Sequence, residues 1–126
     1  MIAYLDTNVV VRLAHGRMRG IGREASRVMT RAELLVSPMV LLELEYLYEI
    51  ARLTLPGRDI LLKLEHELSV RLCDLPFADV ARAALDERWT RDTFDRFIVA
   101  QAKLNGLAPL ISSDQEIAKH YPRTVW

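Results

Sequence analysis

Short apolar runs alternate along the chain with longer segments in which apolar residues recur every three or four positions. The apolar runs lie at 2–5, 34–36, 70–75 and 109–112, and their length is typical of buried strands. The periodic segments predict helices at 9–14, 23–31, 39–53, 59–69, 77–88 and 92–104. A further short helix should end at about residue 120. Strands that alternate with helices favour a parallel sheet covered by helices on both faces.

The expected fold is therefore α/β, a three-layer α/β/α arrangement around a central parallel sheet of four or five short strands. We expect residues 1–126 to form a single domain, because no linker, repeat or low-complexity segment interrupts the alternation. A hydrophobic share of 51%, with 5 glycines and 5 prolines, is enough for a packed core that needs no stabilisation by disulfides or a structural metal.

Charge and cysteine content narrow the class of protein. The 17 basic and 17 acidic residues cancel, which removes the simplest argument for a nucleic-acid binder, although a basic rim around an acidic pocket would also sum to zero. Cys73 is the only cysteine, so it cannot form an intramolecular disulfide, and we expect it to be a small buried residue. Asp6 ends the first apolar run after very few residues, so this run is too short for a signal peptide or a membrane span. We therefore expect a soluble, cytoplasmic protein.

Aspartates follow two of the predicted strands and open a predicted helix. Asp6 comes directly after 2–5, and Asp114 follows 109–112. Asp92 and Asp95 stand three residues apart at the start of the helix at 92–104, so their side chains lie on neighbouring parts of its surface. Asp6, Asp92 and Asp114 are also good N-cap residues, and capping alone would account for each of them.

Glu43 does not fit the polar side of its helix. Glu45, Glu49 and Arg52 form one polar stripe, whereas Glu43 lies on the opposite side among apolar neighbours. A carboxylate in such a place costs several kcal/mol unless it is paired, protonated or bound to a cation. An ion pair is one explanation, but no basic residue of this helix can reach Glu43.

The parallel architecture would bring all these carboxylates to one edge of the sheet, where successive strands end. Acids packed together raise one another's pKa, so a positive charge must neutralise them. Oxygen ligands without histidine or thiol suit Mg²⁺ or Mn²⁺, and acid-lined sites for these ions are common in enzymes that hydrolyse phosphodiesters.

Four stretches in order resemble the PIN domain, and more narrowly a VapC-type toxin of a toxin-antitoxin pair. They are Tyr4 to Val9, Ser37-Pro38 followed by Glu43, Asp92 to Ala102, and Leu110 to Asp114. Each motif alone is weak, but the ordered set is specific. In one place the chain departs from the family, because Thr93 replaces a proline between the two acids, which lowers local rigidity and leaves the chemistry intact.

The resemblance implies specific roles for residues of this chain. The catalytic, metal-binding acids would be Asp6, Glu43, Asp95 and Asp114, with one or two Mg²⁺ or Mn²⁺ ions. Accessory positions would be Asp92, Thr7, Asn8 and Ser112, of which the last three would hold the acids by hydrogen bonds. The implied activity is metal-dependent endonucleolytic cleavage of RNA, in a homodimer that a cognate antitoxin protein holds inactive.

We therefore expect a Mg²⁺-dependent endoribonuclease in which a water molecule attacks the phosphodiester. Candidate phosphate-binding residues are Arg12, Arg23, Arg27, Arg31 and Arg96. The apolar helices between Pro38 and Ser69 are candidates for a dimer contact.

Two alternatives remain open. One is a haloacid dehalogenase-type phosphatase with Asp6 as nucleophile, although that class needs a second aspartate where this chain has Asn8. The other is an inactive PIN-like module that only binds RNA or a partner.

Overall fold

The computed structural model describes residues 1–126 and contains five strands and seven helices. In chain order these are β1 (Ile2–Leu5), α1 (Thr7–Ala14), α2 (Arg23–Arg31), β2 (Glu33–Val36), α3 (Pro38–Glu49), α4 (Gly57–Leu68), β3 (Arg71–Leu72), α5 (Phe77–Ala84), α6 (Thr93–Leu104), β4 (Leu110–Ile111), α7 (Gln115–His120) and β5 (Thr124–Val125).

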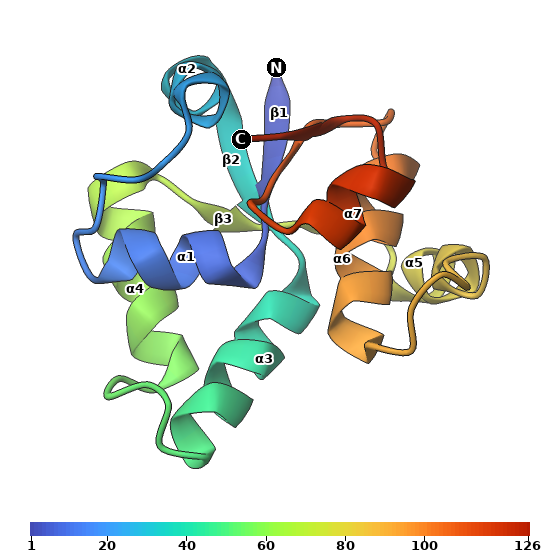
Figure 1. Cartoon of the computed structure of the whole chain (residues 1–126). Helices are drawn as coiled ribbons and strands as arrows, with labels where there is room; N and C mark the ends of the chain where they lie inside the picture. Colours follow the sequence, from blue (N-terminus) through green and yellow to red (C-terminus); the bar gives the residue numbers. More distant parts are fainter.

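The strands form one sheet in the order β3-β2-β1-β4-β5, and every neighbouring pair is parallel. In Figure 1, α1, α2 and α4 lie to one side of the sheet, and α5, α6 and α7 lie to the other, while α3 extends beyond the ends of the strands. The predicted three-layer α/β/α fold with a parallel sheet is confirmed.

Several element boundaries differ from those that the pattern predicts. The runs at 70–75 and 109–112 are longer than the strands they contain, which are Arg71–Leu72 and Leu110–Ile111. The helix predicted to reach residue 53 ends at Glu49, since Ala51 takes the left-handed conformation at φ 63°. Arg52 therefore lies outside the helix and does not continue its polar stripe.

The strands are buried and hold the two helical layers together. Tyr4, Leu5, Leu110 and Ile111 are inaccessible to solvent, as expected for strands covered on both faces. The buried Tyr4 hydroxyl accepts a hydrogen bond from Asn105 at 2.7 Å and lies 2.9 Å from the Cys73 thiol. Cys73 is thus buried, as predicted, but it also has a polar partner. No helix combines the length and the apolar character needed to cross a bilayer.

The strand order reverses direction between β1 and β4. From β1 the chain proceeds to β2 and β3 on one side, then crosses to β4 and β5 on the other. In open α/β sheets such a switch point leaves a crevice at the carboxyl ends of the strands, which is where these folds bind their ligands. Asp6 follows β1 directly, and Ser112 follows β4 directly, so both flank this crevice.

Candidate active site

Asp6 lies at the switch point and is held there by Thr7, the first residue of α1, and by Ser112, which follows β4. The side chain is only 4% exposed. Oδ2 accepts a hydrogen bond from the Ser112 hydroxyl at 2.7 Å, and Oδ1 accepts one from the Thr7 backbone N–H at 2.8 Å. Asp6 is also the N-cap of α1, so the same carboxylate begins a helix and projects into the crevice.

Glu43 reaches the same edge from α3. It is the sixth residue of that helix and lies in its second turn. Its Oε1 accepts a hydrogen bond from the Thr7 hydroxyl, so Thr7 contacts two different acids, Asp6 through its backbone N–H and Glu43 through its side chain. The ion pair that could have explained Glu43 is absent, and its carboxylate has a hydroxyl as its protein partner instead.

Asp92 and Asp95 divide their roles at the start of α6. Asp92 is the N-cap, and its Oδ1 accepts the Asp95 backbone N–H at 3.0 Å. Asp92 is exposed, whereas Asp95 is half-buried on the side of the helix that faces the other acids. No protein group donates a hydrogen bond to the side chain of Asp95.

Asp114 caps α7 with one of its two oxygens. Oδ1 accepts the backbone N–H groups of Glu116 and Ile117 at 2.8 and 3.2 Å. The Ser112 hydroxyl accepts the backbone N–H of Asp114 at 3.1 Å while it donates to Asp6. Ser112 therefore links the two acids that follow β1 and β4.

The carboxylates affect one another's protonation. Burial, followed by the charges of Asp92, Asp6, Asp114 and Glu43, raises the pKa of Asp95 from 3.8 to about 7. Burial also raises the pKa of Asp6 and of Glu43, and nearby carboxylates add to both shifts. All five acids thus lie close enough together to repel, which is the convergence that the strand ends predicted.

No basic side chain offsets this negative charge. None of the five ion pairs of the protein includes one of these carboxylates. The side chains as they stand do not form a ready-made set of three ligands around one point. Their chemistry nevertheless fits a hard divalent cation, because all are oxygen donors, and because mutual repulsion is relieved when a cation draws them together.

The sequence as a whole matches a known domain. The profile of the PIN domain matches residues 3–121. The chain belongs to the PIN domain family. None of the curated proteins compared with this PIN domain matches it in sequence.

Solved structures share the fold of this PIN domain. A chain of a toxin-antitoxin complex from Klebsiella pneumoniae is 19% identical with a TM-score of 0.66, over 98% of this chain and 96% of that one. A chain of VapBC2 from Rickettsia felis, bound to a DNA fragment from its promoter, is 18% identical with a TM-score of 0.65, over 99% and 96% of the two chains. The profile match confirms the predicted resemblance to PIN domains, and both structures confirm the fold.

The predicted arginines of this PIN domain do not gather around the acids. Arg96 donates from Nε and Nη2 to the carbonyl groups of Ala84 and Leu85, both at 3.2 Å, and so ties α6 to the end of α5. Arg27 pairs with Glu24 at 3.3 Å. Arg23 and Arg31 are exposed on the same side of α2, away from the core.

Two further predicted residues have different placements. Arg12, in the last turn of α1, donates from Nη1 to the Arg19 carbonyl at 3.3 Å, and its guanidinium carbon lies 5.9 Å from the centroid of the Trp126 ring. Asn8 is exposed and makes no side-chain hydrogen bond within the protein. Trp126 is a candidate that the sequence argument missed, because the two-residue strand β5 before it gives almost no periodic signal.

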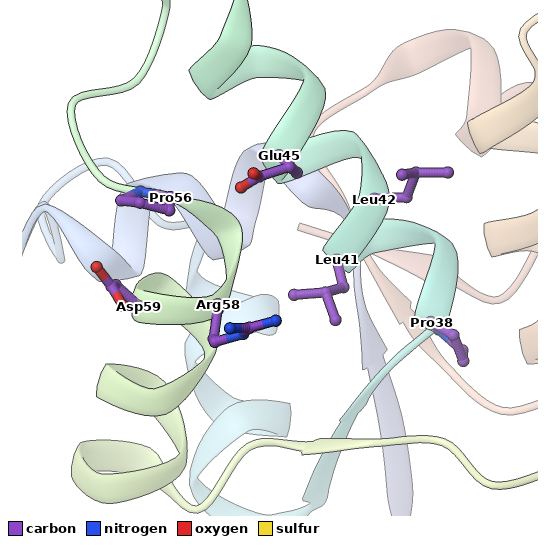
Figure 2. Close-up of a pocket in the computed structure, with 7 residues that line it drawn as sticks. All are labelled: Pro38, Leu41, Leu42, Glu45, Pro56, Arg58 and Asp59. Atoms are coloured by element: carbon purple, nitrogen blue, oxygen red, sulfur yellow. The ribbon is translucent and has the colours of Figure 1, made fainter.

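A hollow of the PIN domain lies away from the acidic edge. It has a volume of about 520 Å³ and lies between α3 and α4. Figure 2 shows its lining, which includes Leu41, Leu42, Glu45 and Arg58 but none of the five carboxylates. We place the chemistry at the switch point rather than in this hollow, because only the former gathers groups with mutually perturbed pKa values.

Proposed function

We propose that this PIN domain is a Mg²⁺- or Mn²⁺-dependent endoribonuclease that acts as the toxin of a toxin-antitoxin pair in the cytoplasm. The observation that carries the proposal is the convergence of five carboxylates from four parts of the chain, which raises the pKa of Asp95. PIN domains are generally nucleases, and an acidic cluster without a basic partner suits a metal-dependent one.

Four acids are the proposed metal ligands. Asp6, Glu43, Asp95 and Asp114 would hold one or two ions, and the exposed Asp92 would assist from the start of α6. When bound, the ion would supply the charge that activates a water molecule and screens the phosphate of RNA. Ser112 and Thr7 would orient Asp6 and Glu43 through the hydrogen bonds described above.

A water molecule is the proposed nucleophile, since no protein side chain is suited to the role. Cys73 is buried against the Tyr4 hydroxyl, and the Ser112 hydroxyl donates to Asp6. Asp6 is a poor candidate for a phosphatase-type nucleophile, because both its oxygens accept hydrogen bonds and the side chain is 4% exposed. Membership of the PIN family also argues against a haloacid dehalogenase-type phosphatase.

The proposed partners are a cognate antitoxin and a second copy of this chain. Support for an antitoxin comes from the two structural neighbours, which are both chains of toxin-antitoxin complexes. Support for a homodimer comes from the helices between Pro38 and Ser69, where apolar side chains remain exposed to solvent: Leu42, Tyr46, Tyr48, Ile50, Leu55, Leu62 and Leu68.

RNA cleavage with and without metal tests the proposed activity. We expect the wild-type protein to cut structured RNA in the presence of Mg²⁺ or Mn²⁺ and to stop when EDTA is added. Asp6→Asn should be inactive, whereas Asp86→Asn, a matched change at an exposed aspartate outside the cluster, should cleave like the wild type.

Three other results would contradict the proposed activity or favour one of the alternatives. Cleavage that persists in EDTA would contradict the metal mechanism. A folded wild-type protein that binds RNA but does not cut it with either ion would favour the inactive module. A trapped phosphoaspartate at Asp6 would favour the phosphatase.

A further inference from the structure

Three side chains form a row across the carboxyl ends of neighbouring strands. Leu5 pairs with Ile111, and Ile111 pairs with Val125, so the next residues in register are Asp6, Ser112 and Trp126. Side chains in one such row project from the same face of a parallel sheet. The Ser112–Asp6 hydrogen bond agrees with this for the first two, and Trp126 contacts Arg12 of α1, the helix that Asp6 caps. Two strand spacings put Trp126 about 10 Å from Asp6.

A groove connects the acidic cluster to this tryptophan. Its volume is about 180 Å³, and both Asp114 and Trp126 line it, together with mostly small or polar residues: Ser112, Ser113, Gln115, Ala118, Thr124 and Val125. The groove thus contains a proposed metal ligand and an aromatic ring.

Positive charge borders the aromatic end of the groove. The Arg12 guanidinium lies against the Trp126 ring and is held by the Arg19 carbonyl, but no carboxylate pairs with it. Between residues 7 and 32 the chain contains six arginines and a single acidic residue, Glu24. The zero net charge of the whole chain therefore conceals a basic segment that leaves the acidic edge along α1 and contacts Trp126.

We propose that this groove binds a nucleotide of single-stranded RNA next to the one that is cleaved, with its base against Trp126 and a phosphate at Arg12. A flat aromatic ring combined with an unpaired guanidinium is the arrangement that proteins use to bind unpaired bases and their backbone. Stacking on an aromatic ring accepts every base, so binding would depend on strandedness more than on sequence. The link to cleavage rests on the proposed function, but the binding does not.

Oligonucleotide binding without metal tests the groove directly. The probe is an unstructured RNA of about ten nucleotides in EDTA, measured by fluorescence anisotropy with the wild type and four variants. Trp126→Leu should weaken binding about five- to a hundredfold, which corresponds to the loss of one stacked base. Trp126→Phe should stay within about threefold of the wild type, because it keeps an aromatic face.

Arg12→Gln should weaken binding about tenfold, and Arg88→Gln, at an exposed arginine outside this region, should not.

Intrinsic fluorescence supplies a second readout that does not depend on how well Trp126→Leu folds. The protein has two tryptophans, and Trp89 is engaged with Glu87 and His120. Unlabelled RNA should quench the wild type, and this quenching should disappear in Trp126→Phe although that variant still binds RNA.

The outcomes separate this inference from the proposed function. Unchanged RNA affinity in Trp126→Leu and Arg12→Gln, or quenching that persists in Trp126→Phe, would overturn the groove proposal even if the wild type cleaves RNA. Loss of affinity in those variants would support it even if no cleavage occurs with any metal. For a protein that does cleave, the Trp126 and Arg12 changes should raise KM more than they lower kcat.

Discussion

At the scale of single residues, capping and site formation turn out to be compatible roles. Asp6, Asp92 and Asp114 are all N-caps, as the sequence allowed, and yet all three contribute to the pKa of Asp95. Asp92 and Asp114 each use Oδ1 for the cap, which leaves Oδ2 without a protein partner. A motif that satisfies a helix start can therefore also present a metal ligand.

The pH dependence of stability should reveal the repulsion at Asp95. Because the folded-state pKa is raised from 3.8 to about 7, the folded protein binds this proton more tightly than the unfolded chain. The resulting stabilisation is fully present below the unfolded value and is lost as the pH rises through about 7. In EDTA, urea unfolding should show the wild type losing stability relative to Asp95→Asn between about pH 4 and pH 7.

Addition of Mg²⁺ tests whether the loss of stability arises at a site that binds a cation. Mg²⁺ should restore wild-type stability at the upper pH more than it restores that of Asp95→Asn, since an ion that binds the folded state stabilises it. Parallel pH profiles for the wild type and Asp95→Asn would show that Asp95 titrates normally, contrary to the account.

Thr7 should matter through the orientation of Glu43. Thr7→Val removes the hydroxyl that donates to Glu43 and keeps the size and shape of the side chain. We expect RNA cleavage to fall about 10- to 100-fold, the usual cost of losing a partner of a metal ligand. Thr7→Ser keeps the hydroxyl and should retain most activity, so equal losses in both variants would indicate a packing role instead.

At the scale of elements, helix α4 depends on a neighbouring helix for its N-terminal cap. Its N-cap residue, Pro56, has no side-chain hydrogen bond to offer. Instead, Glu45 of α3 accepts the backbone N–H of Gly57 at 3.0 Å. Gly57 also permits close packing, because a Cβ there would lie 2.9 Å from the Leu41 carbonyl oxygen. The pairing of α3 and α4 is thus built into their sequences at two positions.

Substitutions at this junction should destabilise the fold without touching the acidic cluster. Glu45→Ala removes the cap and should lower the free energy of unfolding by about 1 kcal/mol. Gly57→Ala should also destabilise, because the rigid Leu41 backbone must move. Glu49→Ala, at an exposed residue of the same helix, is the control for urea denaturation. An unfolding free energy of Glu45→Ala equal to that of Glu49→Ala would mean that the Gly57 bond contributes nothing.

The sequence pattern predicted which elements exist better than where they end. Buried strands such as β1 have a clear apolar run, and their bounds agree with the prediction. Edge strands are decided by pairing, which is why β3 is shorter than its apolar run and why β5, at Thr124–Val125, has no apolar run of its own. Likewise, the end of α3 depends on Ala51 in a left-handed conformation, which no glycine or proline signals at that position.

At the scale of the whole molecule, strand order brings distant residues into one place. The β1–β4 switch point joins Asp6 to Ser112, which are 106 residues apart in the sequence. Parallel topology alone predicted that the acids would share an edge. The placement of the arginines could not be predicted, because it depends on which carbonyl or aromatic group each long side chain meets, as Arg96 and Arg12 illustrate.

Self-association is expected from the apolar surface that α3 and α4 leave exposed. The exposed apolar residues of α3 and α4, including Leu42 and Leu62, leave more hydrophobic surface than an isolated domain needs. Light scattering at micromolar concentration should give the mass of a dimer, and Leu42→Glu should shift it toward a monomer. A wild-type monomer without any partner would contradict the proposed homodimer.

Metal binding in the absence of RNA is the most direct test of the central claim, that carboxylates at the switch point hold a divalent cation. Calorimetric titration with Mn²⁺ needs no knowledge of the RNA target. We predict one or two ions bound by the wild type, at least tenfold weaker binding in Asp6→Asn and in Asp95→Asn, and wild-type binding in Asp86→Asn. Affinity that is equal in all four proteins, or the absence of binding to the wild type, would contradict the account.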